Sequence, residues 1–99
     1  MSEAIEVTTF RLKGHSCGEF IAANAEIDGW LQRQPGFRSR RIAERYDGAI
    51  VDMLTWDSVA DGERAAAGIL TEMADSPVHA MIDQDTVDWT VASVRHGIG

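Results

Sequence analysis

The sequence has few of the residues and runs that would assign a class of protein at once. Cys17 is the single cysteine among 99 residues, which excludes an internal disulfide and fits a reducing compartment. Only 9 Lys and Arg stand against 16 Asp and Glu, a formal net charge of −7. Such an acidic surface repels phosphate, so we expect neither nucleic acid nor an anionic membrane as a partner. No long apolar run and no basic N-terminal segment is present, so we predict no membrane span, no signal peptide and a cytoplasmic location.

The motifs of cofactor and metal chemistry are missing as well. The chain has no glycine-rich phosphate loop, no Cys/His pattern of a zinc site and no H-E-x-x-H. We therefore expect no cofactor and no metal. The hydrophobic content of 44% is ordinary for a folded protein, and the length predicts a single domain over 1–99.

A β-hairpin is the clearest local signal. Asp47-Gly48 separates two extended runs, 37–46 and 49–56. Asp-Gly is typical of the tight I′ turn, whose two central residues both have positive φ. We therefore predict a two-residue I′ turn at this position.

One strand-like and one helix-like segment precede the hairpin. Residues 3–13 are rich in β-branched side chains and predict a strand. Ser16 and Glu19 have the spacing of a capping box, which predicts that a helix begins there. An apolar stripe with spacings of three and four continues the helix until Pro35-Gly36 ends it.

The second half repeats this order in reverse. Ser58 has the position of an N-cap for a helix over 59–74, and Ser76-Pro77 predicts a short further helix over 77–83. Residues 86–95 predict the last strand. The order β-α-β-β-α-β is the ferredoxin-like split βαβ arrangement, an α+β fold with a four-stranded antiparallel sheet. Right-handed crossovers place strands one and three at the centre.

Both faces of this predicted sheet carry apolar side chains. In the third strand, Ile50, Leu54 and Trp56 alternate with Ala49, Val51 and Met53, and the first and fourth strands show the same mixture. The two helices cover one face only. We therefore expect a second copy of the chain to cover the other face, giving a homodimer.

The residues that mark the ends of these elements resemble those of a known superfamily. Pro35-Gly36-Phe37, the Asp47-Gly48 hairpin, Trp56-Asp57-Ser58 and Asp75-Ser76-Pro77 look like the dimeric α+β barrel superfamily, which includes the antibiotic-biosynthesis monooxygenases. The resemblance covers the whole chain and implies a ligand pocket between sheet and helices. Its haem-degrading branch uses an asparagine on strand one and a tryptophan in helix two. Neither stands there in this chain, so haem degradation is not implied.

Four residues are candidates for such a pocket. His79 follows Pro77 where the resemblance places the pocket opening, and a neutral imidazole there can act as a base; the alternative is an ordinary surface histidine. Trp56 and Trp89 can wall a pocket for a planar molecule or simply pack in the core. Asp52 interrupts the third strand, where a carboxylate needs a partner or a wet cavity. We predict Arg41 on the neighbouring strand as its ion-pair partner.

Two further groups have weaker signals. Cys17 and His15 lie at the start of the first helix, where a lowered thiol pKa would suit redox or nucleophilic chemistry. Five arginines between positions 33 and 45 form a basic cluster, which on an edge strand protects against edge-to-edge pairing.

Two functions remain open from the sequence. The first is a dimeric protein that binds a small aromatic or apolar molecule without a catalytic role. The second is a cofactor-independent monooxygenase of the antibiotic-biosynthesis type, with His79 as the proton-handling group and Asp52, Trp56 and Trp89 around the substrate.

Overall fold

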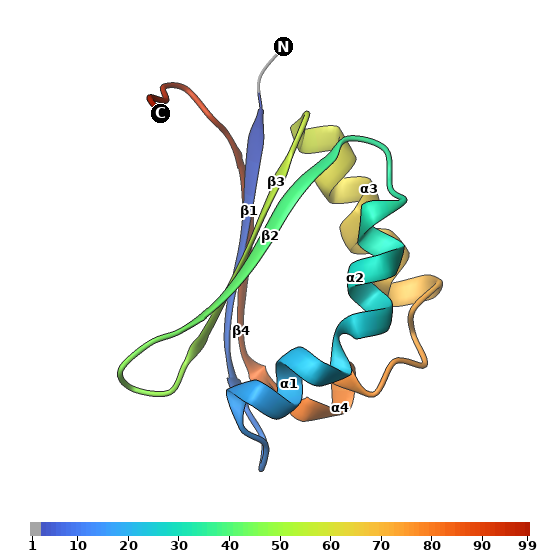
Figure 1. Cartoon of the computed structure of the whole chain (residues 1–99), viewed down its shortest axis with the longest axis vertical. Helices are drawn as coiled ribbons and strands as arrows, with labels where there is room; N and C mark the ends of the chain where they lie inside the picture. The colour runs from blue at the N-terminus through green and yellow to red at the C-terminus, as the bar shows by residue number, and fades with distance from the viewer. Residues whose placement is uncertain (1–2) are drawn as a thin grey trace.

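The computed structural model describes residues 3–99 and has one sheet with helices packed on one face (Figure 1). Its elements, in chain order, are β1 (Ala4–Leu12), α1 (Cys17–Ala23), α2 (Ala25–Gln32), β2 (Phe37–Glu44), β3 (Ile50–Trp56), α3 (Val59–Thr71), α4 (Val78–Met81) and β4 (Ile82–Ser93). No helix in this part of the chain is long and apolar enough to cross a membrane.

The predicted fold class is confirmed. The four strands are antiparallel neighbours in the order β2-β3-β1-β4, with the first and third strands at the centre. The register pairs Thr8 of β1 with Asp52 of β3 on one side and with Trp89 of β4 on the other. Three polar or aromatic residues from three strands therefore lie in one row across the middle of the sheet.

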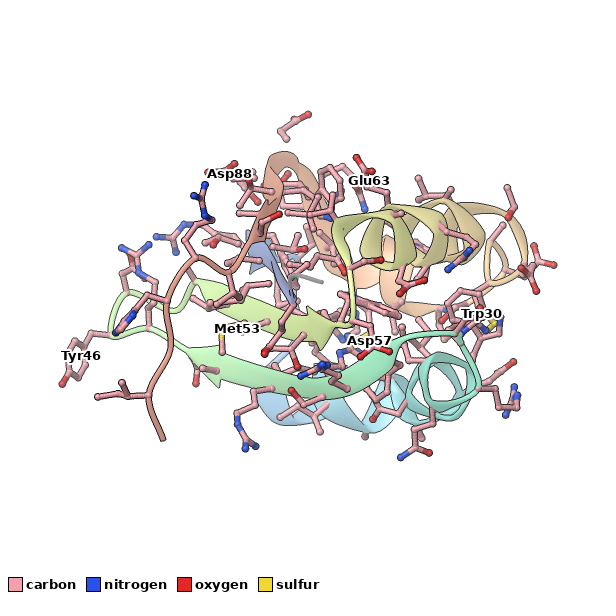
Figure 2. All side chains as sticks on the ribbon, turned by 90° about the horizontal axis from the view of Figure 1, so that it is seen from above. Trp30, Tyr46, Met53, Asp57, Glu63 and Asp88 are labelled. Atoms are coloured by element: carbon pink, nitrogen blue, oxygen red, sulfur yellow. The ribbon has the colours of Figure 1, made fainter. Side chains whose placement is uncertain are left out.

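The hairpin forms as predicted, but its turn type was predicted wrongly. Gly48 has a φ of 87°, whereas Asp47 has a negative φ, so this is not a I′ turn. The Gly48 amide donates to the Arg45 carbonyl (3.0 Å) and the Arg45 amide donates to the Ala49 carbonyl (2.8 Å). The loop thus has three residues, ending in a left-handed glycine, and Tyr46 at its tip projects away from the molecule (Figure 2).

The first predicted helix is interrupted at Asn24. The Asn24 amide bonds to the Ile21 carbonyl, while its side-chain amide donates to the Phe20 carbonyl at 2.8 Å. The side chain thus occupies the acceptor that a continuing α-helix would give to the backbone, and the chain re-starts as α2. The predicted capping box is present: Glu19 and Ser16 bond each other's backbone amides.

The second half differs from prediction at its boundaries. α3 ends at Thr71 and α4 spans only Val78–Met81, so the last strand begins at Ile82, four residues earlier than predicted. The added strand residues pair with the end of β1, where Arg11 faces Asp83 beyond an irregularity in the register. Ser58 caps α3 as predicted, its hydroxyl accepting the Asp61 amide.

The core lies between the sheet and the helices. Phe10 and Phe20 meet edge to face at 5.3 Å, and Phe37 meets Trp56 in the same way at 5.5 Å. α3 can approach closely because a Cβ at Gly68 would lie only 2.8 Å from the ring of Trp30. The opposite face of the sheet, here called the outer face, carries Ile5, Val7, Val51 and Met53, and no helix of residues 3–99 covers it.

Candidate functional site

A cavity of about 570 Å³ lies between the inner face of the sheet and the helices. We call it the sheet–helix cavity. Its lining residues come from every strand and every helix: Glu6, Thr8, Phe10, Phe20, Asn24, Ile27, Arg40, Asp52, Glu63, Ala66, Ala67, Ile69, Leu70, Val78, His79, Ile82, Gln84, Val87 and Trp89. Apolar side chains form most of this wall. The buried polar groups are concentrated on the sheet side.

An ion pair between Arg40 and Asp52 forms part of that polar side. Nε and Nη2 of Arg40 donate to the two carboxylate oxygens of Asp52 at 3.1 and 2.7 Å, a bidentate pair. Arg40 also donates to Asp28 at 2.8 Å and to Asn24 at 2.9 Å. Burial alone would lower the pKa of Arg40, but the hydrogen bonds and charges of Asp52 and Asp28 raise it, so the guanidinium stays charged.

The prediction of Arg41 as the partner of Asp52 was wrong. Arg41 is paired in register with Met53 and therefore lies on the outer face, because neighbouring residues of a strand point to opposite faces. Arg40 and Asp52 both face inward, on adjacent strands. The basic cluster is accordingly divided: Arg38 pairs with Glu3 and Asp57 at the surface, whereas the Arg40 side chain faces inward and is 11% exposed.

Glu6 is the central polar residue that sequence reasoning missed. It lies in the middle of β1 and is 6% exposed. Trp56 donates its indole N–H to Oε1 at 2.9 Å, and Trp89 donates to Oε2 at 2.6 Å. Burial raises the pKa of Glu6, against the two indole hydrogen bonds that lower it. The signal in the sequence was an acidic residue between Ile5 and Val7, the same kind of interruption that drew attention to Asp52.

The four residues predicted from sequence lie at different depths. Asp52, His79 and Trp89 line the sheet–helix cavity, from β3, α4 and β4 respectively. Trp56 is fully buried and is not among the lining residues; it reaches the site through its bond to Glu6. The structure thus places three of the four around one space and the fourth behind it.

His79 is held by a backbone contact at the helical end of the cavity. Its Nε2 lies 2.9 Å from the Met73 carbonyl oxygen. Because a carbonyl oxygen only accepts, Nε2 must carry the proton, and Nδ1 of the neutral ring is the free acceptor. The Gln84 side chain donates to the His79 carbonyl, which ties the start of β4 to α4.

The possibility of a reactive Cys17 is not supported. Burial, followed by the charge of Glu44, raises the pKa of the thiol, the opposite of what a nucleophile needs. His15 lies 3.8 Å from Glu19 instead of acting on the thiol. Among residues 3–99, no group of three or more His, Cys, Asp and Glu side chains is arranged to hold a metal ion.

Comparison with solved structures identifies the fold. SnoaB, a cofactor-independent oxygenase from Streptomyces nogalater, is 20% identical with a TM-score of 0.77, and the match covers 99% of this chain and 98% of SnoaB. Rv0793 from Mycobacterium tuberculosis is 15% identical, with a TM-score of 0.73 over 99% and 100% of the two chains. The ActVA-Orf6 monooxygenase of Streptomyces coelicolor, in complex with nanaomycin D, is 19% identical, with a TM-score of 0.67 over 98% and 91%.

These similarities show the fold of the chain. The chain has the ferredoxin-like α+β fold that is also found in SnoaB, the ActVA-Orf6 monooxygenase and an antibiotic-biosynthesis-monooxygenase-like protein from Bacillus cereus. No protein-family model matches the sequence, and the comparison with curated proteins finds no match. At about 20% identity the likeness describes the architecture and leaves the chemistry to be argued from the residues.

Proposed function

We propose that the sheet–helix cavity binds a small, planar, mostly apolar molecule that has one polar end. The observation that carries this proposal is the cavity itself: about 570 Å³, within the range of small-molecule sites, with apolar walls and a few converging polar groups. Phe10, Phe20 and Ile27 supply apolar surface, and Trp89 supplies an aromatic edge. The polar end of the ligand would lie near Glu6 and Asp52.

We further propose that the protein oxidises such a ligand without a cofactor. Two proteins of the same fold support this second step, since one is a cofactor-independent oxygenase and the other a monooxygenase bound to nanaomycin D. An electron-rich hydroxyaromatic molecule can itself reduce O₂. For a CH₂ group between two aromatic rings, one oxygen atom becomes the new carbonyl and the other leaves as water with the two hydrogens. His79 is the proposed proton acceptor, through Nδ1.

Oxygen uptake with 1,8-dihydroxyanthrone tests this function, with the buffer reaction as the background. We expect the protein to accelerate quinone formation, with one O₂ consumed per quinone, and His79→Phe to slow it by about tenfold or more. Binding of nanaomycin D, measured by calorimetry, tests the cavity separately. Binding without faster oxygen uptake would reject the oxygenase and leave a binding protein, the other function that the sequence left open. Failure of both would reject the proposed function.

We also propose that a second copy of the chain covers the outer face. Ile5, Val7, Val51 and Met53 form an apolar surface there, and Met53 is 37% exposed. A single acidic chain would rarely leave such a surface to water. The expected interface buries roughly 1,500–2,500 Å² in total.

A further inference from the structure

Glu6 has an unusual position for a carboxylate. It is buried on a central strand and lines the sheet–helix cavity, and within residues 3–99 no Lys or Arg side chain is bonded to it. Its two bonds come from the neutral indoles of Trp56 and Trp89, one to each oxygen. Each carboxylate oxygen can accept more than one hydrogen bond, so acceptor capacity remains on the cavity side.

The cation whose charge acts on Glu6, Arg40, is bonded to other groups. Arg40 gives two hydrogen bonds to Asp52, one to Asp28 and one to Asn24, which uses four of its five N–H groups. Arg40 therefore does not neutralise Glu6 by direct contact, although its charge acts on Glu6 from a distance.

Acidic side chains outnumber basic ones around the cavity. Of the lining residues in the described part of the chain, Arg40 is the only Lys or Arg, whereas Glu6, Asp52 and Glu63 are acidic, and His79 is the one further titratable group. Asp52 also acts on Glu6 by charge repulsion. An anionic ligand would meet this negative potential without a free cation to receive it.

We propose that Glu6 is the specificity-determining residue of the cavity: it accepts a hydrogen bond from a hydroxyl or N–H at the polar end of a neutral ligand and excludes anionic ligands. This inference rests on the proposed binding function and names the ligand class that the cavity takes. Trp56 and Trp89 are positioning residues, because they hold both carboxylate oxygens in place. A purely structural role for Glu6 would hold the two indoles equally well and would not discriminate among ligands.

Three naphthalene probes of similar size test the proposal at about pH 8, well above the ordinary pKa of a carboxylic acid such as the third probe. They are 2-naphthol, which donates a hydrogen bond, 2-methoxynaphthalene, which does not, and 2-naphthoate, which is an anion. We expect the wild-type protein to bind 2-naphthol about tenfold or more tightly than either of the others, the size of one hydrogen bond to a charged group. In Glu6→Gln the 2-naphthol preference should shrink and 2-naphthoate should bind more tightly. Glu26→Gln, an exposed carboxylate on α2 outside the cavity, is the matched control and should leave the ranking unchanged.

A second variant keeps the proposal testable if Glu6→Gln does not fold. In the wild type, the ratio of 2-naphthol to 2-naphthoate affinity should rise with pH as Glu6 ionises. Trp89→Phe keeps an aromatic ring but removes one donor to the carboxylate, so the midpoint of that rise should move to higher pH. Equal binding of all three probes to the wild type, or a ratio that does not change with pH, would overturn the proposal while leaving the binding function intact. Failure of the wild type to bind any of the probes, together with failure to bind nanaomycin D, would overturn both.

Discussion

Arg40 and Asp52 form a two-point ion pair on adjacent strands, with nitrogen–oxygen distances of 3.1 and 2.7 Å and side chains that are each 11% exposed. The pair connects the edge strand β2 to the central strand β3 on the inner face of the sheet. Through Asp28 and Asn24, the same guanidinium also reaches α2 and the break between the two short helices. One side chain therefore links the sheet, the interrupted helix and the cavity wall.

Removing the Asp52 carboxylate should destabilise the folded protein. Asp52→Ala leaves the largely buried Arg40 without its bidentate partner, and we expect a loss of about 3–5 kcal/mol in the free energy of unfolding, measured with urea. Asp28→Ala is the control, because Asp28 is 51% exposed; it should cost less than about 1 kcal/mol. Equal losses in the two variants would contradict this account. So would an Asp52→Asn protein that melts within about a degree of wild type but binds ligand poorly, since Asp52 would then serve the pocket and not the fold.

The architecture was predictable because its signals are local. Capping residues, the Pro35-Gly36 stop and runs of β-branched residues each act within a few residues and predict the order of strands and helical segments. The handedness of the crossovers then predicts the sheet order. The break at Asn24 was not predicted, because an asparagine within a helix does not by itself show that its side chain will bond the Phe20 carbonyl. In the folded protein Arg40, 16 positions away, donates to the amide oxygen of the same side chain.

The site was predictable only in part, for the same reason. Asp52 was recognisable as a polar residue in a strand, but its partner depended on which face each arginine occupies, and β2 has a register shift between Phe37 and Ser39. Glu6 was missed because its importance comes from two tryptophans, 50 and 83 positions along the chain. Long-range pairing of this kind leaves no short-range pattern.

Gly36 should be among the positions least tolerant of a side chain. Its φ is 79°, and a Cβ there would collide with the carboxylate of Asp61. Gly14 has a similar φ of 68° but open space around it. Gly14→Ala should cost about 1–2 kcal/mol from backbone strain alone, and Gly36→Ala should cost clearly more. Urea unfolding of the pair measures the difference, and equal costs would show that Asp61 moves aside freely.

The proposed dimer makes a prediction about the outer face. Met53→Lys places a charge in the middle of the apolar surface and should convert a dimer into a monomer at micromolar concentration, as measured by sedimentation equilibrium. Ile21→Lys is the control, because Ile21 is 47% exposed on α1, on the helical side of the sheet. A wild-type protein that sediments as a monomer would contradict the proposed dimer. A dimer that persists in Met53→Lys would place the interface elsewhere.

The buried carboxyl of Glu6 should make stability depend on pH in a defined direction. Its pKa is raised above the ordinary value near 4.5, chiefly by burial, so the folded state holds the proton more tightly than the unfolded state. The stabilising contribution of the protonated carboxyl is fully present below the unfolded pKa and is lost as pH rises through the folded pKa.

Other carboxylates titrate in the same range, so the useful quantity is the difference in stability between the wild type and Glu6→Gln, which cannot ionise at this position. From about pH 4.5 upward, the wild type should lose stability relative to Glu6→Gln by as much as about 1.4 kcal/mol per pH unit, and the difference should become constant above the folded pKa. Urea unfolding of both proteins between about pH 4 and about pH 8 measures it. A difference that stays flat would mean that the two indole hydrogen bonds balance burial. A difference that favours the wild type increasingly as pH rises would mean that they outweigh burial and that the pKa of Glu6 is lowered in the folded protein.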